Sequence, residues 1–240
     1  MKKIIFPLLL LFCFSCKKEN IESKITNKKE HVNQQSGTDT ASIVKSVKFL
    51  TSLEKEIITE FSEFEKKQEL SDTFSKLFYK KISENTETLI YDFNALKEQT
   101  NIKVATSPDK KFRVYSWDNN SGGTMRFFNQ IVQFTSTNGT ITHLNLNSDD
   151  SQAFISKIYS LQNKKNETIY FQISNTISST KDVGQSIDAY KIDTSELIPT
   201  DVFNTGKKQT NYIRVDYDFF SVLDRPERPV ELITLNDGIL

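Results

Sequence analysis

The sequence predicts an α+β fold in which N-terminal helices pack on a curved antiparallel β-sheet, arranged as a sandwich or an open barrel. Apolar residues recur every three or four positions over about residues 42–100, which is typical of amphipathic helices. After about residue 101 apolar and polar residues alternate, which is typical of strands. Short turn signals such as Asn138-Gly139 separate the later segments, and short connections favour antiparallel neighbours.

The first residues have the pattern of an export signal. Lys2 and Lys3 form a positively charged start, and residues 4–14 form an apolar segment just before Cys16. As a helix this segment would be roughly 16 Å long, about half the thickness of a bilayer core. It is therefore too short to span a membrane, and Ser15 supplies the small residue that a signal peptidase requires next to its cut.

Residues 13–16 resemble the lipobox of bacterial lipoproteins, which consists of an aliphatic residue, two small residues and a cysteine. Cys13 and Phe14 depart from that pattern. The resemblance implies that residues 1–15 are a signal peptide and that Cys16 carries a diacylglycerol, with a further acyl chain on its amine. Two or more chains anchor a protein stably. Lys17 implies delivery to the outer membrane of the cell envelope, and the alternative is a plain secretory signal cut near Cys16.

Cysteine, histidine and charge exclude several kinds of site. Both cysteines, Cys13 and Cys16, lie in the signal region, so the later chain offers no thiol for a disulfide, a nucleophile or a metal. His143 is the only histidine in the predicted globular region, too few for a zinc site built on histidine. The 31 basic and 31 acidic residues balance, which is no electrostatic footprint for nucleic acid. We therefore expect no metal, no cofactor and no nucleic-acid partner.

Residues 16–41 are polar and charged, and predict a flexible tether. The remaining residues, 42–240, predict a single globular domain with helices over about 42–100 and strands over about 101–240. Thr40 is the predicted N-cap of the first helix. As an alternative, Asp39-Thr40-Ala41 resembles a sequon of bacterial O-glycosylation.

The first predicted helix is roughly 28 residues long and has one apolar stripe, which we expect to pack on the core. The second helix follows an N-cap signal at Ser71-Asp72, and a short third helix is predicted at 93–98. The stripe of the first helix is Ile43, Val47, Leu50, Ile57, Phe61 and Phe64, and that of the second is Phe74, Leu77, Phe78 and Ile82.

Period-two alternation then predicts a series of strands separated by turns. Their order along the sheet is not predictable, because strand pairing depends on residues far apart in the chain. The predicted strands are 102–104, 112–117, 124–134, 140–146, 154–161, 168–174, 187–192, 212–218 and 230–234.

One predicted hairpin, with its loop at residues 118–123, suggests a ligand-binding face. That face would stack aromatic rings beside two guanidinium groups and so suit a sugar ring or an anionic ligand. The alternative is an aromatic–arginine ladder that completes the exposed face of a sheet or packs under a helix. The predicted binding residues are Arg113, Tyr115, Trp117, Asp118 and Arg126. The predicted cross-strand pairs are Trp117 with Thr124, Tyr115 with Arg126, and Arg113 with Phe128.

We expect a non-catalytic, lipid-anchored envelope protein that binds a glycan, a peptide or another envelope protein. One alternative is a carboxylate-dependent glycan hydrolase, which needs two acids beside the scissile bond. The other is a structural or assembly subunit that docks through the helix beginning near Ile43. The acids available for hydrolysis are Asp118, Asp149, Asp150, Asp216 and Asp218. The segments Ser107-Pro108-Asp109, Tyr115-Ser116-Trp117-Asp118 and Gly122-Gly123-Thr124 are similar to uncharacterised bacterial lipoproteins, which implies no activity.

Overall fold

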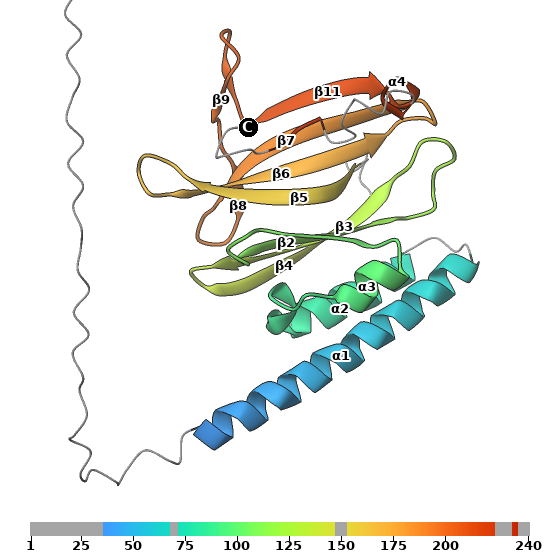
Figure 1. The fold of residues 1–240 in the computed structure, drawn as a ribbon, viewed down its shortest axis with the longest axis vertical. Coiled ribbons are helices and arrows are strands. Elements are labelled where there is room, and N and C mark those ends of the chain that lie inside the picture. The colour runs from blue at the N-terminus through green and yellow to red at the C-terminus, as the bar shows by residue number, and fades with distance from the viewer. Residues whose placement is uncertain (1–35, 68–71, 147–152, 224–231, 235–240) are drawn as a thin grey trace, which may run out of the picture. The chain divides into compact units, whose positions relative to one another are not determined.

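The computed structural model describes residues 36–67, 72–146, 153–223 and 232–234. The chain divides into two units, Met1–Ala41 and Ser42–Leu240. In the second unit helices come first and pack against antiparallel sheets, which confirms the α+β prediction (Figure 1). The sheets are open and do not close into a barrel.

In the described residues, all helices except the last one precede the strands. They are α1 (Ser36–Lys67), α2 (Asp72–Glu84), the 3-10 helix η1 (Thr86–Leu89) and α3 (Asn94–Gln99), and α4 (Phe219–Leu223) follows the last strand. Because α1 begins at Ser36, Thr40 lies within the helix, and the prediction that it is the N-cap is wrong.

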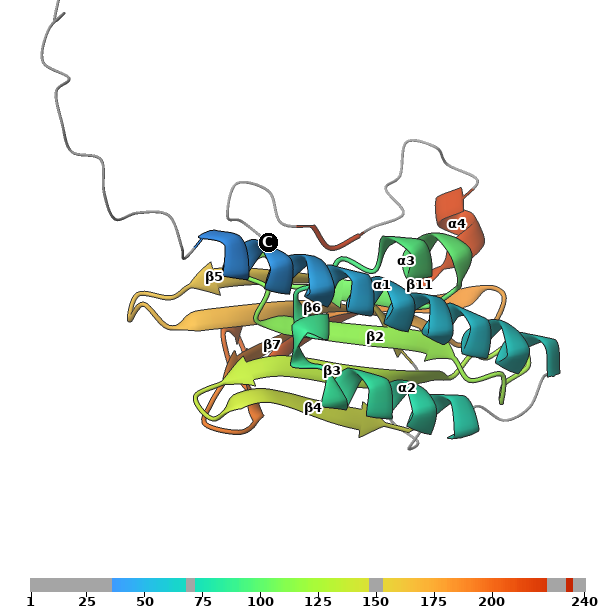
Figure 2. The ribbon, with the colours of Figure 1, turned by 90° about the horizontal axis from the view of Figure 1, so that it is seen from below.

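Sheet A lies against the helices. Its strands are in the order β1 (Lys103–Thr106), β2 (Phe112–Asp118), β3 (Phe128–Ser136) and β4 (Gly139–Asn145), each antiparallel to its neighbour. Figure 2 shows α1 and α2 crossing this sheet.

Sheet B is the second antiparallel layer. Its order is β11 (Tyr212–Asp218), β7 (Asp182–Ile192), β6 (Thr168–Ile177) and β5 (Ala153–Gln162), and β8 (Leu197–Pro199) pairs with the end of β7. A small pair, β9 (Phe203–Asn204) and β10 (Gln209–Thr210), stands apart. Of the predicted strand at 230–234, the described residues 232–234 are not in a strand, and the rest lies outside the described residues.

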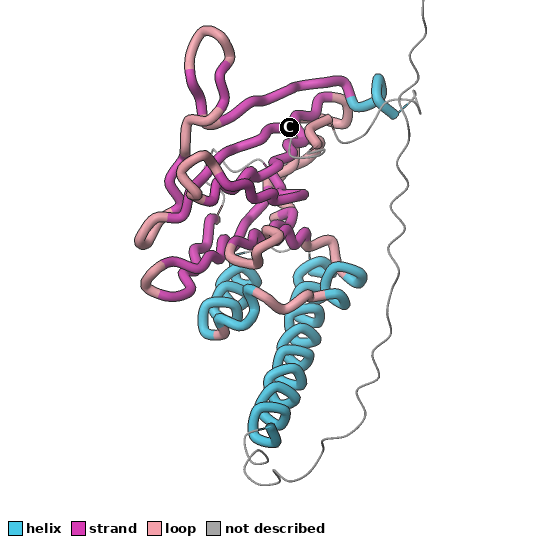
Figure 3. The backbone as a smooth tube through the Cα atoms, turned by 60° about the vertical axis from the view of Figure 1, so that its left-hand side comes forward, coloured by secondary structure: helices cyan, strands magenta, loops and turns pink. Residues whose placement is uncertain are grey.

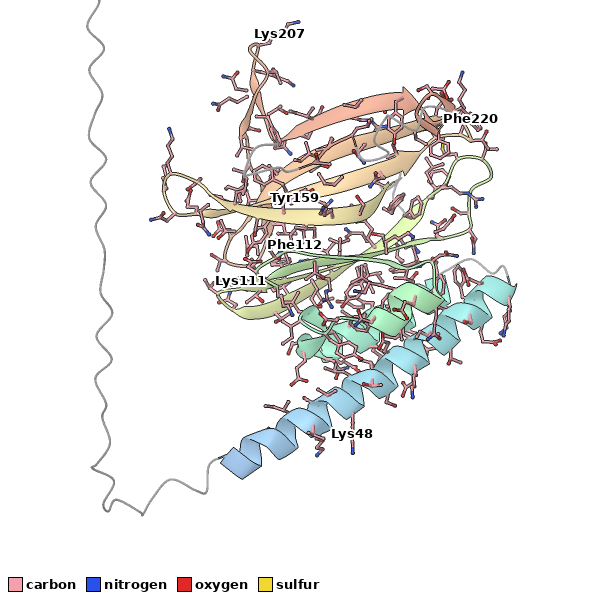
Figure 4. All side chains as sticks on the ribbon, viewed as in Figure 1. Lys48, Lys111, Phe112, Tyr159, Lys207 and Phe220 are labelled. Carbon is pink, nitrogen blue, oxygen red and sulfur yellow. The ribbon has the colours of Figure 1, made fainter. Side chains whose placement is uncertain are left out.

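The core consists of apolar layers on both sides of sheet A. Figure 3 shows the helices on one side of the strands, and in Figure 4 Phe112 lies between the two sheets. Strand β2 is therefore buried on both faces. The layer under the helices includes Ile57, Phe61, Phe78, Leu96, Tyr115, Trp117 and Ile131. The layer between the sheets includes Phe112, Val114, Val132, Phe134, Ile155, Ile158 and Tyr170.

The apolar stripe of α1 packs on the core only in its later part. Leu50, Ile57 and Phe61 are buried, whereas Ile43 is 61% exposed and Val47 is 51% exposed. In Figure 1 the first turns of the helix slope away from the sheets, which leaves these two side chains exposed. For them, the expectation of core packing is wrong.

A buried arginine joins sheet A to the helical layer. The Arg113 side chain on β2 is 2% exposed, and its Nη1 group donates to the backbone carbonyls of Thr88 and Tyr91. Its Nε group donates to Thr106 Oγ1 at 2.7 Å. Its guanidinium group also lies 5.7 Å from the centroid of the Phe93 ring. One side chain thus fixes η1 and the residues that follow it over the sheet.

A buried glutamate joins two helices in the same layer. Glu54 on α1 accepts hydrogen bonds from the Tyr91 hydroxyl and the Leu96 backbone N–H, each at 2.8 Å. The carboxylate therefore satisfies a backbone donor at the start of α3, where helices leave such donors unpaired.

We expect Arg113→Leu to lower the free energy of unfolding by about 2–5 kcal/mol, because it removes the Arg113 donor from the Tyr91 carbonyl and leaves the Thr88 carbonyl with the Tyr115 hydroxyl alone. Urea unfolding followed by circular dichroism measures this. The matched control is Arg126→Leu, whose exposed ion pair with Asp118 contributes less than about 1 kcal/mol. Equal losses in the two variants would contradict the role assigned to Arg113.

Candidate functional site

The predicted ligand-binding face of β2 is buried under the helices. Tyr115 and Trp117 have no exposed surface, and Arg113 is almost fully covered. The predicted hairpin pairing is also wrong, because β3 begins only at Phe128, well beyond the predicted loop. In the observed register Arg113 pairs with Gln133, Tyr115 with Ile131, and Trp117 with Asn129.

Of the other two predicted binding residues, Asp118 is the last residue of β2 and Arg126 lies in the loop that follows. Arg126 Nη1 and Asp118 Oδ2 form an ion pair at 3.2 Å. Arg126 therefore does not stack on Tyr115, and the cation that lies 5.7 Å from the Tyr115 ring centroid is Arg113. Rings that are wholly buried offer a ligand no surface, so this face is not proposed again as a binding site.

The acids considered for hydrolysis do not gather in the described part of the chain. Asp216 Oδ1 lies 2.8 Å from Arg214 Nε, and Asp218 Oδ2 lies 3.2 Å from Lys181 Nζ. Asp149 and Asp150 lie outside the described residues, as does Cys16.

The two sheets separate along one side and leave a cleft of about 690 Å³. On the other side β5 packs against β1 and β2. The cleft lies between β3 and β4 of sheet A and β6, β7 and β8 of sheet B, and it reaches α2. We call it the inter-sheet cleft. Its lining residues are Tyr79, Gln130, Val132, Phe134, His143, Leu144, Asn145, Gln172, Tyr190, Glu196 and Leu197.

Strand alternation explains which side chains reach the cleft. Successive residues of a strand point to opposite faces, so the residues that share the inner face of sheet A are two positions apart. On β4 these include His143 and Asn145, and His143 pairs with Val132 of the core between the sheets. The His143 and Phe134 ring centroids are 5.8 Å apart, which gives the cleft an aromatic wall.

Several polar side-chain groups in the cleft have no hydrogen-bond partner within the described residues. They are the Tyr190 hydroxyl, the His143 ring and the Asn145 amide. The amide nitrogens of Gln130 and Gln172 donate to Ala153 O at 2.8 Å and Ser174 Oγ at 3.3 Å, so their carbonyl oxygens remain available. These donors and acceptors can pair with a bound polar molecule.

The charge of the lining residues restricts which ligands the cleft can bind. Glu196 is the only charged residue among the described residues that line the cleft. With no lysine or arginine there, the cleft has no cation that could neutralise an anionic ligand. Its chemistry therefore suits an uncharged polar molecule.

A partly buried carboxylate lies beside the cleft on the inner face of sheet B. Asp188 pairs across the sheet with Gln172 and accepts hydrogen bonds from Ser186 Oγ at 2.9 Å and Ser174 Oγ at 3.2 Å. Burial raises the pKa of Asp188, although these hydroxyls and Arg214 act in the opposite direction. Burial, together with the charge of Asp188, raises the pKa of Tyr190 to about 12. The Tyr190 hydroxyl is therefore protonated at neutral pH, and it can donate a hydrogen bond to a ligand.

A second hollow of about 480 Å³ adjoins the turns at one end of the sheets. Two lysines, Lys111 and Lys191, line it beside two acids, Glu167 and Asp193. Because opposite charges are mixed there, the hollow favours no particular class of ligand.

The sequence did not identify the cleft. Alternation predicted most of the strands that contribute its residues, but not which strands face one another. His143 was noted only for its lack of a histidine partner. A further signal was present in 139–145, a strand without any charged side chain, which is unusual at the edge of a sheet.

Comparison with known proteins gives no family: no family model, no curated protein and no solved structure matches this chain. Within residues 36–67, 72–146, 153–223 and 232–234, no helix is both long enough and apolar enough to cross a membrane. The same residues contain no group of three or more acidic, histidine or cysteine side chains that could hold a metal ion.

We expect Asp188→Asn to stabilise the protein at neutral pH. The folded-state pKa of Asp188 is raised above its usual value of 3.8. Below pH 3.8 the carboxyl is protonated in both the folded and the unfolded chain, and the folded protein is at its full stability with respect to this group. As the pH rises through the folded-state pKa, the buried carboxyl must ionise and the free energy of unfolding falls. The asparagine variant avoids that loss, so its advantage should shrink as the pH falls from 7 toward 4. Urea unfolding at several pH values measures the difference.

Asp193→Asn is the control of opposite sign. Hydrogen bonds from the backbone and side chain of Thr194 hold the pKa of exposed Asp193 below its usual value. The contribution of Asp193 to the free energy of unfolding is therefore present above the usual pKa of an aspartate and is lost as the pH falls through the lower folded-state pKa. The asparagine variant should be slightly less stable at neutral pH, and a gain in this variant would contradict the electrostatic account.

Proposed function

We propose that this protein is a lipid-anchored, non-catalytic component of the bacterial cell envelope that binds a glycan or a peptide in the inter-sheet cleft. The observation that carries the proposal is a set of polar groups around an open cleft, those of Tyr190, His143 and Asn145, which have no hydrogen-bond partner within the described residues. Pockets for small ligands combine apolar walls with a few converging polar groups. Glycans and peptides both present the hydroxyl or amide groups that such a lining can pair with.

Binding without catalysis fits the lining better than hydrolysis. Glycoside hydrolysis commonly requires two carboxylates on either side of the bond, and Glu196 is the one carboxylate among the described lining residues. Asp118, Asp216 and Asp218 are held in ion pairs away from the cleft lining.

Docking through α1 is not proposed as a second function. Its exposed apolar residues include Ile43, Val44 and Val47. Nothing in the described residues indicates which partner would cover them.

The anchor is tested by the mass of the native protein extracted in detergent. We expect a chain that begins at Cys16 and carries lipid, and we expect Cys16→Ala to abolish the lipid. Cys13→Ala is the matched control and should leave the lipid in place, because residue 13 belongs to the removed signal. An unlipidated wild-type chain cut at another residue would overturn the proposed anchor.

The cleft is tested by calorimetric titration of the full chain in detergent. The probes are solubilised cell-wall oligosaccharides and a panel of uncharged peptides. For the probe that binds, Tyr190→Phe should weaken affinity about 2–10-fold, which is the contribution of one hydrogen bond. Tyr217→Phe is the matched control, because Tyr217 is not part of the cleft lining. Equal affinity in wild type and Tyr190→Phe would contradict this assignment, as would no binding of either class of probe.

A further inference from the structure

One edge of sheet A is open beside the cleft. Within the described residues, β4 pairs with β3 on one side and with no strand on the other. The Thr135 backbone N–H donates to Lys111 O on the β2 side at 2.8 Å, and Thr135 pairs with Thr140. Backbone groups alternate in direction along a strand. Thr140, Thr142 and Leu144 therefore direct their N–H and C=O groups toward the open edge.

The sequence of this edge lacks the usual features that prevent strand pairing. Proteins blunt exposed edges with charged side chains, proline, bulges or very short strands, or they cover the edge with a helix or loop. Helix α2 packs against β4, and Tyr79 of that helix reaches the Thr142 carbonyl at this edge. β4 is 7 residues long, and Gly139–Asn145 contains no proline, lysine, arginine or acid. Its pairing with β3 runs from one end to the other without a register shift.

The other edges of the two main sheets carry such features. Strand β1 packs against β5, and β5 has a register shift between Ile155 and Lys157. Strand β11 carries the Arg214–Asp216 ion pair, and the short β8 ends at Pro199. The unprotected edge is therefore a local property of β4.

The open edge and the cleft are continuous. His143 and Asn145 line the cleft from β4, and Leu197 lines it from β8. A strand added beside β4 would continue sheet A, and every second side chain of that strand would point to the inner face. Those side chains would meet Gln172 and Tyr190 of sheet B across the cleft.

A weak contact occupies part of this edge. The Tyr79 hydroxyl on α2 donates to Thr142 O at 3.3 Å, well beyond the usual 2.7–2.8 Å for such a bond. A peptide N–H could take its place at the carbonyl without breaking the pairing of β4 with β3.

We propose that β4 accepts an extended, uncharged peptide segment of a partner protein as an additional strand of sheet A. The backbone of that segment would pair with the open edge, and its alternate side chains would enter the inter-sheet cleft. Addition of a strand to an open sheet edge is an established mode of peptide recognition. This inference rests on the proposed function of the cleft and specifies its ligand.

The first test uses the full chain in detergent and a displayed library of random seven-residue peptides. The best binder is synthesised with a single N-methyl group at each position in turn. Methylation removes a backbone N–H donor, so positions that pair with β4 should lose about tenfold or more in affinity. The positions between them should lose less than about twofold, which gives a period of two along the peptide.

The second test changes the edge. Thr142→Pro removes an N–H that faces the open edge and leaves the bonds to β3 in place. We expect about a tenfold loss of peptide affinity. Thr142→Val is the matched control, because it keeps the N–H and should bind as wild type does. If the proline variant does not fold, the methylation series decides alone.

Three outcomes would overturn the inference that β4 accepts a strand. They also distinguish a failure of this inference from a failure of the proposed function. Equal tolerance of methylation at all positions would show peptide binding without strand addition. Binding of cell-wall oligosaccharides but of no library peptide would leave a glycan as the ligand of the cleft. Binding of neither class would remove both this inference and the proposed function.

Discussion

The burial of Arg113 is the constraint on which the arrangement of the layers depends. A guanidinium group cannot be deprotonated in a protein, so a buried one must have its donors satisfied. The described residues satisfy it with the carbonyls of Thr88 and Tyr91 and the hydroxyl of Thr106. Thr88 belongs to η1 and Tyr91 lies between η1 and α3, so the charge on β2 fixes the helical layer over sheet A. Glu54 then ties α1 to the start of α3 in the same layer.

Covering one face of sheet A with helices leaves only the other face for sheet B. Strand β5 packs against β1 and β2, and the apolar contacts of Phe112 and Val114 close that side of the interface. Toward β4 the facing residues become polar, with Gln130 and Asn145 on sheet A and Gln172 on sheet B. Amide side chains lose less by remaining hydrated than by being buried without partners. The cleft therefore lies where these polar residues meet the apolar wall of Val132, Phe134 and Leu197.

Local periodicity in the sequence was enough to predict the helices and most of the strands. The predictions that depended on contacts between distant segments were wrong. Alternation located the strand at 112–117, but it cannot tell whether the Tyr115 and Trp117 face meets solvent or a helix. Both surroundings favour the same large side chains, and only the position of α2 makes this face part of the core. The hairpin register failed because the predicted loop of 118–123 was too short. The cleft draws residues from separate strands and from α2, and no pattern within a single segment indicates such an assembly.

Two costs to stability lie beside this one cleft. Burial disfavours the charge of Asp188, and the uncharged edge of β4 exposes the sheet to pairing with other chains. Folding alone would favour an uncharged residue at 188 and a lysine on β4. Proteins depart from such rules mainly at functional sites. In the proposed binding mode the open edge would offer its backbone groups to a peptide beside the hydroxyl of Tyr190. The common location of the two costs is therefore a physical reason, independent of the cleft's volume, to place ligand binding between the sheets.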